Sequence, residues 1–226
     1  MALILSIESA TKNCSIALAA DGEVIALKEL REQQFSHAEK LHSFILEVMT
    51  SADRQLDEID AVAVSKGPGS YTGLRIGVSA AKGLCYALDK PLISVPTLES
   101  LARQVEMAEE GLIVPLLDAR RMEVYSSVYN HLYEEIRETR AEIIESGSYA
   151  EYLDENKVIF LGDGSAKTRE VIQHPNAVFI KDSFPSAREM APIAERKAGN
   201  GQYEDLAYFE PFYLKDFVAG KPKRYF

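Results

Sequence analysis

The predicted order of strands and helices occurs twice along the chain, and this duplication constrains the fold more than any other sequence feature. In the first half, hydrophobic periodicity predicts three strands and then helix, strand, helix, strand and helix, in the segments 3–8, 14–20, 24–30, 36–52, 59–65, 72–88, 92–95 and 97–107. The second half repeats this order more loosely, in the segments 112–117, 123–129, 134–144, 148–153, 157–161, 164–172, 177–180 and 186–198. Asp21 and Gly22 both tolerate positive φ and predict a hairpin turn, while Ser36 with Glu39 predicts the first helix N-terminus. Both halves therefore read as βββαβαβα.

This repeated unit resembles the ribonuclease-H-like half of the actin, sugar-kinase and Hsp70 superfamily, in which two copies make a two-lobed molecule. We therefore predict an α/β fold of the two-lobed actin-like (ASKHA) type. The predicted N-terminal lobe spans 1–108, and the predicted C-terminal lobe spans 109–226 and ends in an extended basic tail. The alternative is one irregular α/β domain.

The charge and hydropathy of the chain exclude several classes of function. The net charge of −10 disfavours binding of free nucleic acid, which depends mostly on neutralising phosphates. The basic residues Lys215, Lys221, Lys223 and Arg224 are the exception, although most such tails are only solvated. The N-terminus lacks a basic region, and no apolar run reaches the roughly 18 residues that span a bilayer, so we expect a cytoplasmic protein. We expect the only two cysteines, Cys14 and Cys85, to be buried free thiols.

Two turns are candidates for binding an anion or a nucleotide. The turn at 7–15 places a carboxylate where the superfamily uses one, but no glycine lets its amides approach a polyphosphate closely; the alternative is a plain hairpin turn with a surface carboxylate. The turn at 65–77 joins a strand to a helix whose first amides are free to bind an anion; the alternative is a tight turn set by Pro68 and its flanking glycines. The candidate contacts are Glu8, Thr11, Gly69, Thr72 and Arg75.

The first two long helices carry candidate faces for a protein partner. In the second helix, small residues recur at steps of four, and a glycine inside a helix costs about 1 kcal/mol unless close packing compensates. The packing partner could be the chain's own sheet or another subunit. The first helix is apolar on more than one side, which indicates two packing partners. The candidate docking residues are Leu41, Phe44, Ile45 and Val48 in the first helix, and Gly73, Gly77, Ala81 and Cys85 in the second.

Catalytic motifs are scarce. His37 and His42 are five residues apart on one helix and do not share a face, and His131 and His174 are isolated. The sequence contains no H-E-x-x-H, no C-x-x-C and no nucleophile elbow. We therefore expect no metal and no cofactor.

Four segments resemble the TsaB (YeaZ) family. The segment 67–77, Gly-Pro-Gly-Ser-Tyr-Thr-Gly-Leu-Arg-Ile-Gly, is similar to the family signature, and 117–125, Leu-Asp-Ala-Arg-Arg-Met-Glu-Val-Tyr, is similar to the opening of its second half. The Gly-Asp-Gly turn at 162–164 and the segment 210–215, which has Lys in place of the family's final Arg, also resemble it. The clearest departure is Glu8, which stands where Asp is usual.

The resemblance implies a degenerate relative of TsaD, the catalytic subunit that makes threonylcarbamoyladenosine in tRNA. TsaD binds a metal through two histidines, and Thr97 and Leu101 stand at the matching positions here, so the TsaD-type metal site cannot form. The implied role is that of a non-catalytic subunit, which docks on TsaD through its first two helices, works with the ATPase TsaE and forms a homodimer without TsaD. We expect it to meet tRNA only indirectly, through the complex. Three alternatives remain: an ATP-dependent phosphotransferase using Glu8, a metallopeptidase, and a self-associating structural protein.

Overall fold

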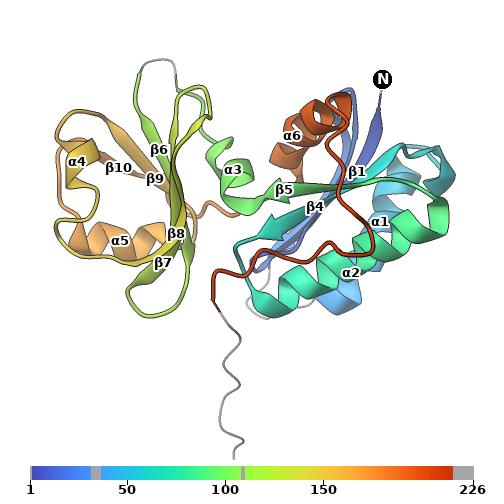
Figure 1. Cartoon of the computed structure of the whole chain (residues 1–226), viewed down its shortest axis with the longest axis horizontal. Coiled ribbons are helices and arrows are strands. Elements are labelled where there is room, and N and C mark those ends of the chain that lie inside the picture. Colours follow the sequence, from blue (N-terminus) through green and yellow to red (C-terminus); the bar gives the residue numbers. More distant parts are fainter. Residues whose placement is uncertain (1, 32–36, 108–109, 216–226) are drawn as a thin grey trace, which may run out of the picture.

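The computed structural model describes residues 2–31, 37–107 and 110–215 and contains two lobes side by side (Figure 1). The first-half elements are β1 (Leu3–Glu8), β2 (Asn13–Ala20), β3 (Glu23–Arg31), α1 (His37–Ser51), the 3₁₀ turn η1 (Leu56–Glu58), β4 (Ala61–Gly67), α2 (Tyr71–Leu88), β5 (Leu92–Pro96) and α3 (Thr97–Ala102). The second-half elements are β6 (Leu112–Asp118), β7 (Glu123–Asn130), β8 (Glu135–Ile143), α4 (Ala150–Leu153), β9 (Val158–Leu161), α5 (Ser165–Val171), β10 (Ala177–Phe179) and α6 (Ala187–Gly199). The predicted order is confirmed; the predicted cap Ser36 and the tail residues Lys221, Lys223 and Arg224 lie outside the described residues.

The two five-stranded sheets have the same strand order, which confirms the duplication. The orders are β3-β2-β1-β4-β5 and β8-β7-β6-β9-β10. In each sheet the first three strands are antiparallel neighbours; the fourth strand adds in parallel beside the first, and the fifth adds in parallel beside the fourth. Asp21 and Gly22 have φ of +54° and +79°, as the predicted hairpin turn requires.

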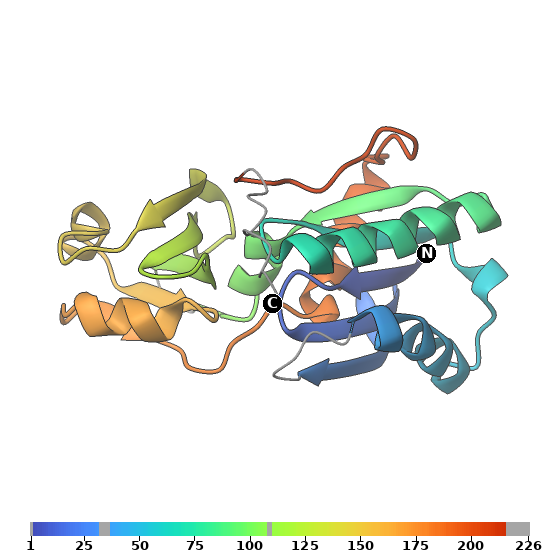
Figure 2. The same cartoon turned by 90° about the horizontal axis from the view of Figure 1, so that it is seen from below.

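Strand alternation divides the first sheet into two apolar faces. Leu5 and Val62 belong to the core shared with α1 and α2, whereas Ile4 and Ala63 belong to the core shared with α6. Figures 1 and 2 show α6 on the opposite side of this sheet from α1 and α2. The α6 side of the core is built largely of alanines, so this helix can lie close to the strands. The first sheet is therefore covered by helices on both faces.

The two halves exchange helices, which corrects the predicted lobe boundaries. α6 belongs to the second half of the sequence but packs on the first sheet. α3 belongs to the first half but packs on β6 of the second sheet, with Leu98 and Leu101 buried in that core. The prediction that 109–226 forms one C-terminal lobe is therefore wrong from α6 onward. The predicted helix 97–107 is also shorter than expected, because after Ala102 the chain continues in tight turns that bury Val105.

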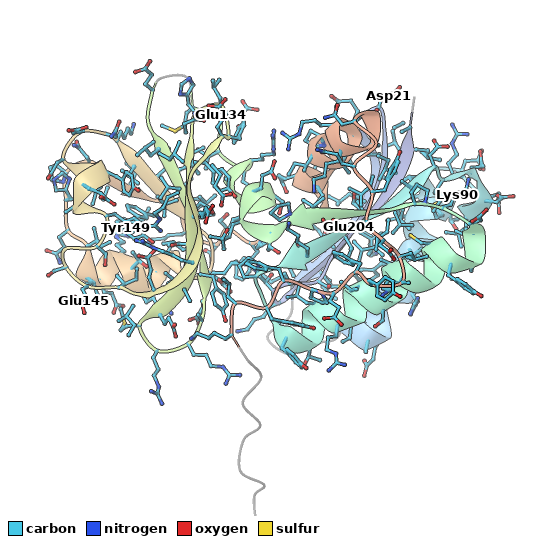
Figure 3. The ribbon with its side chains drawn as sticks, viewed as in Figure 1. Asp21, Lys90, Glu134, Glu145, Tyr149 and Glu204 are labelled. Carbon is cyan, nitrogen blue, oxygen red and sulfur yellow. The ribbon has the colours of Figure 1, made fainter. Side chains whose placement is uncertain are left out.

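A C-terminal strap, residues 200–215, returns along the first lobe and ends against the second (Figure 1). Glu204 forms a bridge with Leu92 at the free edge of β5, where Figure 3 labels it. The ammonium group of Lys82 on α2 donates to the carbonyls of Ala207 and Phe209, 3.1 Å in each case. At the strap's end, Lys215 pairs with Glu123 of β7, so the strap connects both lobes.

Candidate functional site

The predicted docking residues of α1 are buried in the first lobe itself. Leu41, Phe44, Ile45 and Val48 belong to the core that packs on β2 and β3. Their assignment as a surface for a partner is therefore wrong. The face of α1 that remains accessible carries Leu46, which is 60% exposed.

The small-residue stripe of α2 also faces inward. A Cβ added to Gly77 would lie 2.1 Å from Oγ of Ser9 and 3.6 Å from Cγ2 of Ile7, both on or beside β1. Ser9 Oγ donates to the carbonyl of Gly73, 2.9 Å away. All four stripe residues, Gly73, Gly77, Ala81 and Cys85, are buried. The stripe therefore permits α2 to lie close to its own sheet. The prediction that it docks a partner is wrong, because the sheet covers it.

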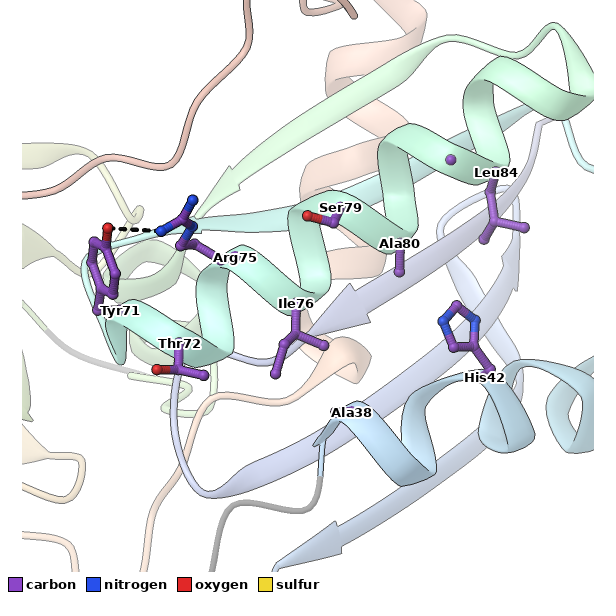
Figure 4. Close-up of a pocket in the computed structure, with 10 residues that line it drawn as sticks. Ala38, His42, Tyr71, Thr72, Arg75, Ile76, Ser79, Ala80 and Leu84 are labelled. Atoms are coloured by element: carbon purple, nitrogen blue, oxygen red, sulfur yellow. Dashed lines mark hydrogen bonds between the residues drawn. The ribbon is translucent and has the colours of Figure 1, made fainter.

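An open groove lies between the outer faces of α1 and α2 (Figure 4). Its volume is about 720 Å³, and it is lined by Ala38, His42, Tyr71, Thr72, Arg75, Ile76, Ser79, Ala80, Gly83 and Leu84. On α2, Ile76, Ala80 and Leu84 recur at steps of four and form an apolar row. A Cβ added to Gly83 would meet nothing within 4 Å. Sequence reasoning missed this groove, although the row of Ile76, Ala80 and Leu84 beside the glycine stripe was a visible signal.

Glu8 is sealed inside the first lobe. Its carboxylate accepts hydrogen bonds from the Ala10 amide (2.6 Å) and the Ser65 hydroxyl (3.0 Å), while Oε2 has no partner among the described residues. Burial raises the pKa of Glu8 to about 7, and these hydrogen bonds oppose that rise. The expectation of a surface carboxylate is therefore wrong, because no part of Glu8 reaches solvent.

The two turns proposed as an anion site meet through backbone contact. The amide of Ser70 donates to the carbonyl of Ala10 (2.6 Å), and a Cβ at Gly69 would lie 2.6 Å from that oxygen. Gly69 is thus required by the close approach of the two turns. The nearby Thr11 is buried.

The remaining two candidate anion contacts line the groove. Thr72 and Arg75 are exposed on α2, and the guanidinium of Arg75 donates to the hydroxyl of Tyr71 at 2.9 Å (Figure 4). The structure therefore places them among apolar groove residues, whereas Glu8 and Thr11 are interior.

Two positions that bear on metal binding lie in the interior. Thr97 and Leu101, which stand at the positions of the TsaD histidines, are fully buried on α3. Within 2–31, 37–107 and 110–215, no three His, Cys, Asp or Glu residues are grouped so that they could hold a metal ion. No helix in these ranges is long and apolar enough to cross a membrane.

A second pocket, of about 510 Å³, lies beside the Gly-Asp-Gly turn of the second lobe. Gly162 has φ of +102°, and an added Cβ would lie 2.2 Å from the Leu116 carbonyl oxygen, so the turn requires glycine. Asp163 in this turn accepts from the amide of Asp118, and Lys167 pairs with the Asp118 carboxylate at 2.5 Å. These contacts hold the β6–β7 hairpin against α5.

Two sheets of one strand order, joined by exchanged helices, define a two-lobed protein of the actin-like (ASKHA) class. YeaZ from Pseudomonas aeruginosa shares the fold, with a TM-score of 0.78 at 24% identity over 95% of this chain and 100% of that one. The family model described as TsaD, tRNA N6-adenosine threonylcarbamoyltransferase, matches residues 31–223. The tRNA threonylcarbamoyladenosine biosynthesis protein TsaB of Escherichia coli (strain K12) is 31% identical over 96% of each chain. TsaB of Bacillus subtilis (strain 168) is 33% identical over 90% of this chain and 89% of its own length. The chain therefore belongs to the TsaB (YeaZ) family, within the wider group that the TsaD model describes.

Proposed function

We propose that this chain is a non-catalytic subunit of tRNA threonylcarbamoyladenosine biosynthesis that binds and activates the transferase TsaD, together with TsaE, in the cytoplasm. The product would be N6-threonylcarbamoyladenosine at the tRNA adenosine next to the anticodon. Without TsaD, we expect the same surface to pair with a second copy of the chain and form a homodimer. Family membership supports the pathway, and the groove between α1 and α2 supports the docking role.

The groove is the observation that carries the docking proposal. Its floor is an apolar row on α2, Ile76, Ala80 and Leu84, and its rim is polar, with His42 and Arg75. An apolar centre with a polar rim is the usual anatomy of a protein interface. The small side chain of Ala38 and the bare backbone at Gly83 leave room for a partner helix to approach closely. Leu46, exposed on α1, extends the apolar surface.

Two interior features support the absence of catalysis. A general base or nucleophile must come within hydrogen-bond reach of its substrate, and Glu8 is enclosed by its own lobe. The side chains at the two histidine positions of TsaD, those of Thr97 and Leu101, are poor metal ligands and are packed in the core of the molecule. These features count against the phosphotransferase and metallopeptidase alternatives.

The experiment combines reconstitution with a charge placed in the groove. The purified chain is mixed with TsaD, TsaE, unmodified tRNA, ATP and the threonylcarbamoyl precursors, and transfer to tRNA is measured with and without the chain. We expect transfer only in the complete mixture. Transfer by the chain alone, or full transfer without it, would overturn the proposal.

The groove itself is tested by Gly83→Glu, with Gly147→Glu as the matched control, because an added Cβ meets open space at both positions. A carboxylate at Gly83 would lose its water against the apolar groove, so we expect TsaD affinity to fall at least about a hundredfold. The control should bind normally. Equal affinities for the two folded variants would exclude this groove as the docking surface.

A further inference from the structure

A row of aromatic and cationic side chains crosses from the first lobe to the second beside the docking groove. It starts on α2, where the Arg75 guanidinium carbon lies 5.3 Å from the centroid of the Tyr71 ring. The Tyr71 ring meets the ring of Tyr213 on the strap, with centroids 5.0 Å apart and planes inclined by 37°. Two rings and one guanidinium thus lie together at the N-terminal end of α2.

The row continues on the second lobe. The ammonium of Lys215 lies 6.0 Å from the centroid of the Tyr125 ring on β7. Arg120 lies next to this strand, since its carbonyl accepts from the amide of Glu123 at 3.1 Å. Burial raises the pKa of Tyr125 and so does the charge of Glu123, whereas the charges of Lys215 and Arg120 oppose that rise. Arg120 and Arg121 form the β6–β7 turn, are exposed, and have φ of +72° and +51°. We call Arg75, Tyr71, Tyr213, Lys215, Tyr125 and Arg120 the stacking row.

Tyr125 is half-buried and packs in part against the apolar cluster between α3 and the second sheet, but core packing does not account for the exposed members of the row. The strap is anchored by Leu206 and Phe209, which pack against the first core, and by the Phe212 amide, which donates to the Lys66 carbonyl at 2.7 Å. Tyr213 comes after these anchors, belongs to none of the apolar clusters of the described residues, and remains 37% exposed. Arg75 is also exposed, and within the described ranges it forms no ion pair with a carboxylate.

We propose that the stacking row binds unpaired nucleotides of an RNA, by stacking bases on Tyr71, Tyr213 and Tyr125 and pairing phosphates with the interleaved cations. Rings alternating with Arg and Lys are the arrangement that holds single-stranded nucleic acid with little sequence preference. The family acts in tRNA modification, so an RNA is a more fitting occupant than a peptide. The net charge of −10 would keep RNA away from most of the remaining surface and confine it to this row.

The position of the stacking row beside the docking groove indicates what an RNA contact would do for the complex. Tyr71 and Arg75 belong both to the row and to the lining of the docking groove. RNA on the row would therefore lie beside a partner docked in the groove, and the subunit would help to hold the substrate of the transferase. This goes beyond the proposed docking function, because it gives the chain RNA contacts of its own.

The test uses the full chain and fluorescein-labelled unmodified tRNA at low salt, with fluorescence anisotropy and ultraviolet cross-linking as readouts. We expect Tyr213→Ala to weaken binding about five- to a hundredfold, the range supplied by one stacked base, and Tyr213→Phe to bind within twofold of wild type. Tyr208→Ala is the matched control, because this strap tyrosine is 85% exposed and lies outside the row; it should also stay within twofold. Arg75→Ala should reduce the salt dependence by about one phosphate contact, because Arg75 has no carboxylate partner among the described residues, whereas Lys215 already pairs with Glu123. Cross-links should map to the peptides that carry Tyr71, Tyr125 or Tyr213.

Several results would overturn this inference. They are the absence of tRNA binding by the wild-type chain, equal losses for Tyr208→Ala and Tyr213→Ala, and cross-links confined to other peptides. A blunt RNA duplex that binds as well as tRNA would show that only phosphates are recognised and would exclude stacking. TsaD binding measured on Tyr213→Ala separates the two proposals, since we expect docking to be unchanged when the RNA contact is lost.

Discussion

Two glycines on α2 provide a test of which face of this helix packs inward. Replacing glycine by alanine in a helix stabilises it by about 1 kcal/mol when the new methyl group has room. At Gly83 the added Cβ meets open space, so Gly83→Ala should raise the free energy of unfolding by about that amount. At Gly77 the same atom would lie 2.1 Å from Ser9 Oγ and 3.2 Å from Ser9 Cβ. Gly77→Ala therefore forces Ser9 to move.

The magnitude follows from what Ser9 would lose. Its hydroxyl donates to the Gly73 carbonyl in a buried site, and breaking such a bond costs about 1–3 kcal/mol. Overpacking adds about 1–3 kcal/mol. After subtracting the helix-propensity gain, Gly77→Ala should destabilise the chain by about 1–5 kcal/mol. The two alanine variants should therefore differ by about 2–6 kcal/mol and have opposite signs relative to wild type.

The assay is urea unfolding followed by circular dichroism, with midpoints compared at constant slope. Ser9→Ala supplies the control, because it removes the clashing oxygen: in the double variant, Gly77→Ala should cost at least about 1 kcal/mol less than it does alone. If Gly77→Ala stabilised the chain as Gly83→Ala does, the stripe would not be packed on β1, and it would again be available to a partner.

Three further predictions concern buried groups. Because the pKa of Glu8 is raised in the folded state to about 7, the folded chain binds this proton more tightly than the unfolded chain, and protonation favours folding. This contribution to the free energy of unfolding is complete below pH 4.5 and is lost as the pH rises to about 7. Glu8→Gln, which mimics the protonated acid, should remove that loss and stabilise the chain at pH 8 by up to about 3 kcal/mol; an unchanged pH profile of the urea midpoint would contradict this. Cys14 and Cys85 are buried thiols with pKa raised by burial to about 11, so a thiol reagent should label them only as the chain unfolds, and rapid native labelling would show that they are accessible. Arg137 donates to Glu142 at 2.5 Å inside the second lobe, and Arg137→Met should lower the free energy of unfolding by about 1–3 kcal/mol, because it leaves the carboxylate with only the more exposed cation of Arg140; a thermal melt equal to wild type would refute this.

The local elements of this protein are readable from the sequence, because each depends on residues close together in the chain. The Asp21-Gly22 hairpin, the helix with Leu41, Ile45 and Val48 on one face, and the duplicated element order all follow from such short-range patterns. The predicted start of α6 is also confirmed, since Ser186 caps it by accepting from the Arg188 amide. The four motifs that resemble the TsaB family likewise lie in short segments.

The tertiary structure alone decided which of several apolar faces became interior. The sequence shows that α2 has a small-residue stripe with an apolar row beside it, but only the close approach to Ser9 shows that the stripe packs inward and the row lines the groove. The same holds for Glu8, whose burial arises from the meeting of two turns far apart in the sequence. The exchange of α3 and α6 between the lobes was also not predictable, because helical periodicity records that a face is buried and not which sheet buries it. Local sequence thus determined the elements, while contacts between distant segments determined which surfaces remain for a partner.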